Sequence, residues 1–254
     1  MDIHTAESTF IFSRKQMSDV NDNINNRVSA VPVMTESGLA LTDGELEIRA
    51  DLTRMIPRLR QSNLERELLV KAAKIKKTAH AGDEDTAEHI LRAVDATAGF
   101  GEDSLLLAAA GFHVTLYEKD PVIAELLEDS LARAANVEEL REPVSRMRLI
   151  RGDSIEGMRG MDYCPDVILL DPMFPERQKS AAVKKKFQLI HQIEKPCDNE
   201  DELFEAAVCA CPKKLIVKRP SKGSFLAGRA PGYSLKGKAV RYDIYVNPGI
   251  KSQK

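Results

Sequence analysis

The chain has 254 residues, of which 43% are hydrophobic and 30% are charged, and its formal net charge at pH 7 is −2. This composition is too apolar for a disordered chain and too charged for a membrane protein, and no stretch approaches the ~18 consecutive apolar residues of a membrane span. This near-neutral net charge does not by itself indicate a polyanion partner. Basic and acidic regions of the chain can still offset each other in the sum.

The N-terminal quarter of the chain predicts a small unit of its own. Short apolar runs at 10–12, 31–34 and 39–41 are typical of short strands, and the segments between them are polar and prone to turns. We therefore expect a small N-terminal subdomain over residues 1–62, followed by a larger domain over residues 63–254.

The segment from Arg54 to Lys77 is strongly basic, with eight basic residues against two acidic ones. Apolar residues recur in its second half at helical spacing, which predicts an amphipathic helix with Asn63 as its cap. The polar face of that helix is either simply solvated or turned toward nucleic acid.

From about residue 91 short apolar strands alternate with helices. This pattern predicts an α/β fold with a doubly wound, mostly parallel sheet, in which ligands bind at the carboxyl ends of the strands. The predicted strands are 93–96, 114–117, 147–150, 167–170, 215–217 and 240–246, and the predicted helices are 104–110, 121–135 and 202–210.

The first of these strands runs into the loop DATAGFGED at 95–103. Gly99 and Gly101 let the backbone approach a ligand closely, but Ser104 stands where a dinucleotide-binding fingerprint has its third glycine. Three carboxylates in the loop would repel phosphates and suit a ligand that carries an amine and a sulfonium, such as S-adenosylmethionine. They are Asp95, Glu102 and Asp103.

Two further strand ends are also acidic. Glu118 follows the strand at 114–117, roughly 20 residues after the glycine loop, where an acidic residue typically accepts hydrogen bonds from both ribose hydroxyls. Asp153 follows the next strand and can accept from an adenine amino group, while the adjacent Ser154 can donate to the ring. Three acidic strand ends in succession predict a single cofactor-binding edge.

The strand at 167–170 runs into DPMFP at 171–175, similar to the (Asp/Asn)-Pro-Pro-(Phe/Tyr) motif of methyltransferases that modify a planar nitrogen. The lone pair of such a nitrogen is delocalised, so it is a poor nucleophile. The Asp171 carboxylate and a backbone carbonyl can accept its N–H bonds and aim the lone pair at the methyl group. Pro172 stiffens the loop, and Phe174 can stack on the base.

Basic residues follow the motif at once. The segment 177–186 holds five positive charges and no negative ones, and a second basic group spans 213–222. We expect both groups to leave the same carboxyl edge as Asp171, where they would bind an RNA phosphate backbone. The residues assigned to RNA are Arg177, Lys179, Lys184, Lys185, Lys186, Lys218 and Arg219.

Together, the loop at 95–103, DPMFP at 171–175, QKSA and VKK within 178–185, and VKRP at 217–220 resemble ribosomal RNA small subunit methyltransferase J. The resemblance covers roughly residues 63–246. It implies a class I, Rossmann-like methyltransferase fold, S-adenosylmethionine as cofactor, and methylation of a guanine N2 in small-subunit (16S) ribosomal RNA. The cofactor contacts that it implies are Glu102, Asp103, Glu118, Lys119, Asp153, Ser154 and Asp171.

The chain departs from that family in two places. The family usually has arginine at the position of Glu102, and a glycine-rich basic stretch where this chain has the sequence QSNLER at 61–66. The first departure bears on the role of the Glu102 side chain, and the second on how the substrate is positioned.

The leading interpretation is an rRNA guanine-N2 methyltransferase that converts S-adenosylmethionine to S-adenosylhomocysteine without a metal. Its expected partner is small-subunit rRNA or the small ribosomal subunit. Its expected location is the cytoplasm, because four cysteines without zinc-like spacing fit reduced thiols. The same scaffold could instead methylate adenine N6 or a protein glutamine, or serve as a non-catalytic RNA-binding assembly factor. An NAD-dependent oxidoreductase is disfavoured by the missing third glycine.

Overall fold

The computed structural model describes residues 31–42, 44, 47–75, 90–172 and 199–248. Its centre is a seven-stranded sheet, five of whose strands run parallel to one another. The strands are β4 (Arg92–Asp95), β5 (His113–Glu118), β6 (Met147–Arg151), β7 (Val167–Leu170), β8 (Lys214–Pro220), β9 (Tyr233–Lys236) and β10 (Val240–Val246).

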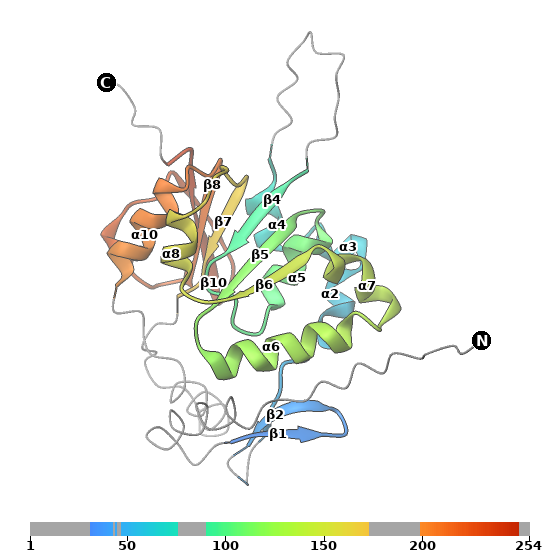
Figure 1. The fold of residues 1–254 in the computed structure, drawn as a ribbon. Coiled ribbons are helices and arrows are strands. Elements are labelled where there is room, and N and C mark those ends of the chain that lie inside the picture. Colours follow the sequence, from blue (N-terminus) through green and yellow to red (C-terminus); the bar gives the residue numbers. More distant parts are fainter. Residues whose placement is uncertain (1–30, 43, 45–46, 76–89, 173–198, 249–254) are drawn as a thin grey trace, which may run out of the picture.

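The order of the strands across the sheet is β6-β5-β4-β7-β8-β10-β9 (Figure 1). The last two, β10 and β9, are antiparallel to their neighbours, so the sheet is mostly parallel, as the alternating pattern predicts. The order reverses at β4, which pairs with both β5 and β7. Such a switch point places a ligand site just beyond the carboxyl ends of β4 and β7.

Helices cover both faces of this sheet (Figure 1). Alternate residues of a strand face opposite layers, so Val167 and Leu169 pack toward one set of helices, and Ile168 and Leu170 toward the other. The first set is α4 (Leu68–Ala73), α5 (Glu102–Ala109), α6 (Pro121–Ala134) and α7 (Glu138–Ser145), and the second is α8 (Ser154–Arg159) and α10 (Glu200–Cys209).

Helix α6 illustrates how local sequence sets an element boundary. Pro121 occupies the first helical turn, where its missing N–H costs nothing, and the Asp120 side chain accepts hydrogen bonds from the backbone N–H groups of Val122 and Ile123. These signals confirm the predicted helix. Helices α7 and α8 and strand β9 are short, and the sequence pattern did not predict them.

A small antiparallel sheet precedes the main one, formed by β1 (Val31–Thr35), β2 (Gly38–Thr42) and β3 (Glu47–Ile48). The strands predicted at 31–34 and 39–41 are therefore confirmed, whereas 10–12 lies outside the described residues. Leu41 and Ile48 of this sheet pack against Leu126 of α6. The subdomain boundary at residue 62 stays a prediction.

The continuous amphipathic helix predicted after Asn63 is wrong. The segment instead forms η1 (Leu52–Met55), α2 (Ile56–Leu59), α3 (Gln61–Leu64) and α4, with extended backbone at Arg60 and Glu67. The Glu67 carboxylate receives two hydrogen bonds from the Arg58 guanidinium, at 2.7 and 2.8 Å, which holds the break in place. Asn63 caps nothing, and its side chain donates to the Pro57 carbonyl. The apolar face still packs against the core, where Ala72 is fully buried.

No helix within the described ranges combines the length and the apolar character that crossing a membrane would need.

Candidate active site

The glycine loop lies between β4 and α5, and both of its glycines have left-handed backbone. Gly99 has φ +52° and Gly101 has φ +76°. A Cβ at Gly101 would lie 2.7 Å from Leu127 Cδ1, so this glycine lets the loop pack against α6. A Cβ at Gly99 would meet no atom of the described residues within 4 Å, so the backbone there presents an open face on which a ligand can lie.

Asp95 supports this loop from behind. It is buried, and its carboxylate accepts hydrogen bonds from Ser104 Oγ at 2.5 Å and from the Thr97 N–H at 3.2 Å. Burial raises the pKa of Asp95 to about 7, although the Ser104 hydrogen bond opposes the shift. The contacts of this carboxylate lie within the loop and α5, so Asp95 shapes the glycine loop.

Glu118 is also buried and faces the same loop from the end of β5. One of its carboxylate oxygens accepts from the Gly99 N–H at 3.0 Å, and the other accepts from the Asp120 N–H at 2.8 Å. Burial raises the pKa of Glu118, and these two backbone hydrogen bonds oppose the rise. Each oxygen retains a lone pair, which suits the two hydroxyls of a ribose. The adjacent Lys119 is exposed.

The third acidic strand end follows β6. Asp153 caps α8 by accepting from the Ile155 N–H at 2.8 Å, and Ser154 is buried at the first position of that helix. Because β6, β5, β4 and β7 are parallel neighbours, Asp153, Glu118 and Asp171 all lie along one carboxyl edge.

Asp171, at the end of β7, belongs to an ion-pair cluster. The Lys218 ammonium of β8 lies 2.8 Å from Asp171 Oδ2 and 2.7 Å from Asp103 Oδ2 on the first turn of α5. Burial raises the pKa of Asp171, and Lys218 opposes that rise. Burial also disfavours the charge on Lys218, but the two carboxylates outweigh it and raise the pKa of the ammonium. The cluster therefore places the Lys218 ammonium where it favours the charged form of Asp171 and opposes the effect of burial.

A second contact ties Asp171 to the glycine loop. The Asp171 N–H donates to Thr97 Oγ1 at 2.7 Å, so the start of the DPMFP segment is fixed to the DATAGFGED loop. Pro172 is buried beside it. The sequence pattern did not predict this contact, because Thr97 and Asp171 are far apart in the chain.

The basic residues assigned to RNA are placed differently from one another. Lys218 faces α5 and is held by carboxylates, whereas Arg219, its neighbour on β8, faces the other side of the sheet. The Arg219 side chain is 3% exposed, donates to the Ser224 carbonyl at 2.9 Å, and pairs with Glu200 at 3.5 Å. These contacts make Arg219 part of the fold. Alternation along a strand was the signal that could have separated the two residues.

The expectation that the whole second basic group leaves the carboxyl edge is wrong for Lys213 and Lys214. Both lie at the amino end of β8, where the Lys214 ammonium donates to the carbonyls of Ala72 and Lys74. The remaining predicted residues lie outside the described residues: Phe174, Arg177, Lys179, Lys184, Lys185 and Lys186.

The donor set fits S-adenosylmethionine. Carboxylates suit its hydroxyl, amine and sulfonium groups, and the open backbone at Gly99 leaves space for it. Within the described ranges, no three His, Cys, Asp or Glu side chains gather as a metal site would require.

Comparisons with known proteins agree with this chemistry. A family model described as "Putative SAM-dependent methyltransferase" matches residues 20–247. Ribosomal RNA small subunit methyltransferase J of Thioalkalivibrio sulfidiphilus (strain HL-EbGR7) is 43% identical over 155 residues, which are 60% of this chain and 61% of that protein. The protein of the same name from Pseudomonas aeruginosa (strain UCBPP-PA14) is 46% identical over 155 residues, 61% of this chain and 59% of that protein. The match thus spans about three fifths of these relatives.

A solved structure extends the likeness over more of the chain. The crystal structure of a SAM-dependent methyltransferase from Neisseria gonorrhoeae covers 89% of this chain and 85% of its own, with 29% identity and a TM-score of 0.67. The expected class I methyltransferase fold is confirmed.

Proposed function

The chain belongs to this family of S-adenosylmethionine-dependent methyltransferases, and we propose that it methylates the exocyclic N2 of a guanine in small-subunit ribosomal RNA. The observation that carries the proposal is the position of Asp171-Pro172, tied to the cofactor loop by the hydrogen bond between the Asp171 N–H and Thr97. Two relatives that are 43% and 46% identical to this chain over 155 residues bear the name ribosomal RNA small subunit methyltransferase J, which favours a guanine in rRNA over adenine, protein glutamine or a non-catalytic role.

The cofactor edge would hold the adenosyl group by its carboxylates. Glu118 would accept hydrogen bonds from the ribose hydroxyls, and Asp153 with Ser154 would contact the adenine. Gly99 leaves the backbone open, and Glu102 and Asp103 at the start of α5 favour the amine. When bound, the cofactor supplies an electrophilic methyl group on a sulfonium.

The substrate side orients a weak nucleophile. Lys218 occupies Asp171 Oδ2, so Oδ1 is the oxygen that we assign to the guanine amino group. One N–H of that group donates to Asp171 Oδ1 and the other to the Pro172 carbonyl, which aims the nitrogen lone pair at the methyl carbon. Asp171 or water would take the proton that the nitrogen releases once it carries the methyl group.

The substrate base must leave its stack to reach this loop if it lies in a helix. We propose that Phe174 stacks on it, and that Arg177, Lys179 and Lys184–Lys186 bind the neighbouring phosphates. The cytoplasm is the location that we assign to this reaction. The cysteines Cys164, Cys209 and Cys211 are free thiols, which is consistent with that compartment.

Mapping of rRNA modification tests the function. We expect small-subunit rRNA from cells that lack this gene to lose one N2-methylguanosine, and the wild-type gene to restore it. A gene that encodes Asp171→Ala should fail to restore it, while its product still binds S-adenosylmethionine by calorimetry. Unchanged nucleosides in the deletion strain, or full restoration by the variant, would contradict the proposal.

A further inference from the structure

A group of exposed basic and aromatic side chains lies beyond the end of β8. It spans the loop 220–225 and the β9–β10 turn, and its members are Lys222, Phe225, Lys236 and Lys238. We call these four residues the Lys222 surface. Phe225 is 40% exposed, and no ion pair to another described residue involves the three lysines.

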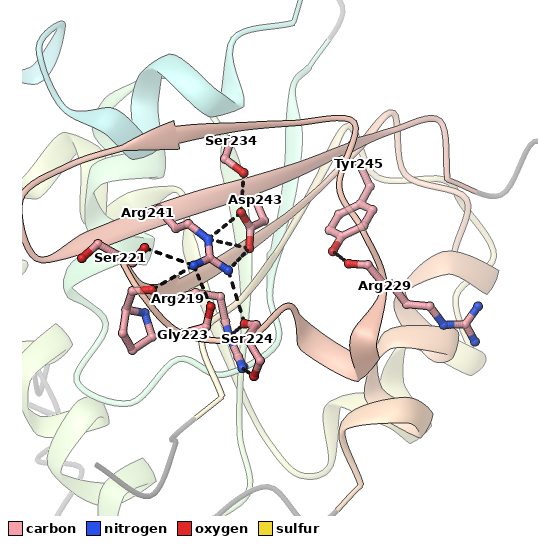
Figure 2. A network of polar contacts seen from close by, with 10 residues as sticks. Arg219, Ser221, Gly223, Ser224, Arg229, Ser234, Arg241, Asp243 and Tyr245 are labelled. Carbon is pink, nitrogen blue, oxygen red and sulfur yellow. Dashed lines mark hydrogen bonds and ion pairs between the residues drawn. The ribbon is translucent and has the colours of Figure 1, made fainter. Parts of the chain in front are cut away.

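The loop that carries this surface is fixed by a buried arginine. Arg241 of β10 is 5% exposed, and its Nη1 donates to the carbonyl oxygens of Gly223 at 2.8 Å, Pro220 at 3.2 Å and Ser221 at 3.3 Å. Figure 2 shows the guanidinium lying between these carbonyls and the Asp243 carboxylate. These three backbone carbonyls therefore accept hydrogen bonds from a buried side chain and not from water, which fixes the loop.

Three more contacts complete this support. The Arg219 guanidinium donates to the Ser224 carbonyl at 2.9 Å, and the Ser221 N–H donates to the Ala239 carbonyl at 2.9 Å, which joins the loop to the β9–β10 turn. The Arg241 guanidinium also lies over the Phe225 ring, with its carbon 5.0 Å from the ring centroid. The backbone that carries the Lys222 surface is therefore fixed before any ligand binds, which lowers the entropic cost of binding.

The surface lies on the same edge of the sheet as Asp171. Strand β8 runs parallel to β7, and Lys218, which contacts Asp171, precedes Pro220 by only two residues. Because side chains alternate along a strand, Lys218 faces α5, whereas Arg219 and Arg241 face α10. The arginines that support the loop 220–225 are therefore not the side chains that contact Asp171.

Charge identifies the kind of partner. Residues 211–248 include nine basic residues and one acidic residue, Asp243, which is fully buried and paired with Arg241. Every exposed charge in this part of the chain is positive, which favours a polyanion. An exposed aromatic ring among lysines is typical of surfaces that bind unpaired nucleotides.

We propose that the Lys222 surface is the docking site for the RNA strand that flanks the target guanine, with its lysines on phosphates and Phe225 stacked on an unpaired base. This proposal rests on the proposed function for its choice of RNA. It adds a second binding surface to the basic segment 177–186.

Charge reversal tests the lysines. We expect Lys222→Glu with Lys238→Glu to weaken binding of a fluorescent small-subunit rRNA transcript by 10- to 100-fold in an anisotropy assay at low salt. The slope of log Kd against log salt concentration should fall by about 1.4, because each lysine–phosphate pair on single-stranded RNA accounts for ~0.7 of that slope. The matched control, Arg141→Glu with Arg148→Glu, makes the same charge change at the opposite end of the sheet and should bind the transcript within a factor of three of wild type.

A pair of aromatic substitutions tests the stacking role. Phe225→Ala should weaken RNA binding by about tenfold, since a stacked base contributes ~1–3 kcal/mol. Tyr233→Ala removes a ring of similar exposure, 42%, from the other end of β9 and should leave binding unchanged. Phe225→Trp should bind RNA about as tightly as wild type and more tightly than Phe225→Ala. A purely structural role for the ring would not predict this result.

These outcomes separate the surface from the proposed chemistry. Calorimetry should give the same S-adenosylmethionine Kd for wild type and both charge-reversal variants, and methyl transfer by Lys222→Glu with Lys238→Glu should show a raised RNA KM with kcat unchanged. If that variant binds the transcript as tightly as wild type, or if the control variant loses as much affinity, the surface is not the docking site. If the wild-type protein binds the transcript through this surface but transfers no methyl group to it, only the proposed function is contradicted.

Discussion

The Lys218 ammonium lies 2.8 Å from the Asp171 carboxylate and also reaches Asp103, at 2.7 Å. One cation from β8 thus joins Asp171, at the end of β7, to helix α5, which begins at the glycine loop. Without it, the buried Asp171 carboxylate would face Asp103 with no counter-charge from Lys218, and the pKa of Asp171 would rise further.

We predict that Lys218→Met lowers kcat by about 100-fold and leaves the RNA Kd within a factor of three, because the ammonium is held by Asp171 and Asp103 and we assign it to positioning Asp171. The acid limb of the kcat/KM profile should move to higher pH, since loss of the cation raises the pKa of Asp171 further and the reaction needs the carboxylate. Lys218→Arg should recover part of kcat.

A double-mutant cycle isolates this role. If Lys218 acts through Asp171, then Lys218→Met should cost almost nothing further in an Asp171→Ala background. Additive losses, or a large change in RNA affinity with an unshifted pH profile, would show that Lys218 has another function.

Glu118→Gln should raise the Kd for S-adenosylmethionine by 10- to 100-fold, because hydrogen bonds to a charged acceptor contribute ~1.5–3 kcal/mol. In wild type the same affinity should fall as pH drops through the raised pKa of Glu118. Calorimetry from pH 4 to 8 measures both effects. Glu139→Gln, on the exposed face of α7, should bind like wild type.

Asp95 makes stability depend on pH. Its folded-state pKa of about 7 exceeds the unfolded value of 3.8, so the folded chain keeps a proton that the unfolded chain has released. The free energy of unfolding should therefore decrease as pH rises from about 4 to 7, by a few kcal/mol at most. We expect Asp95→Asn to flatten this decrease in urea titrations. If the free energy of unfolding of the variant decreases as steeply with pH, groups other than Asp95 cause the decrease.

Arg241→Met should lower the free energy of unfolding by about 3–5 kcal/mol, because Asp243 would remain buried without its counter-charge. The exposed pair between Arg229 and Glu205 provides the control, since Arg229→Met should cost no more than about 1 kcal/mol. Urea unfolding of the two variants beside wild type makes the comparison, and equal losses would contradict it.

The sequence was most informative where a local rule fixes the outcome. Asp120-Pro121 determines where α6 starts, and the apolar run at 167–170 followed by Asp171 determines where β7 ends. The continuous helix predicted after Asn63 is wrong because helical spacing of apolar residues does not reveal a break in the helix. The Arg58–Glu67 contact that holds the break joins residues nine apart in the chain. The short elements α7, α8 and β9 carry too little periodicity to be recognised.

By itself the sequence determined the parallel α/β order, the glycine loop and the acidic strand ends, because each depends on residues close together in the chain. Only the tertiary structure decided what those side chains do. It turned Lys218 toward Asp171 and Asp103, sent the adjacent Arg219 to the opposite face, and made Asp95 a buried support for the loop. The reason is physical: burial and the distance to a partner set the charge and the role of an ionisable group, and both are properties of chain segments brought together by folding.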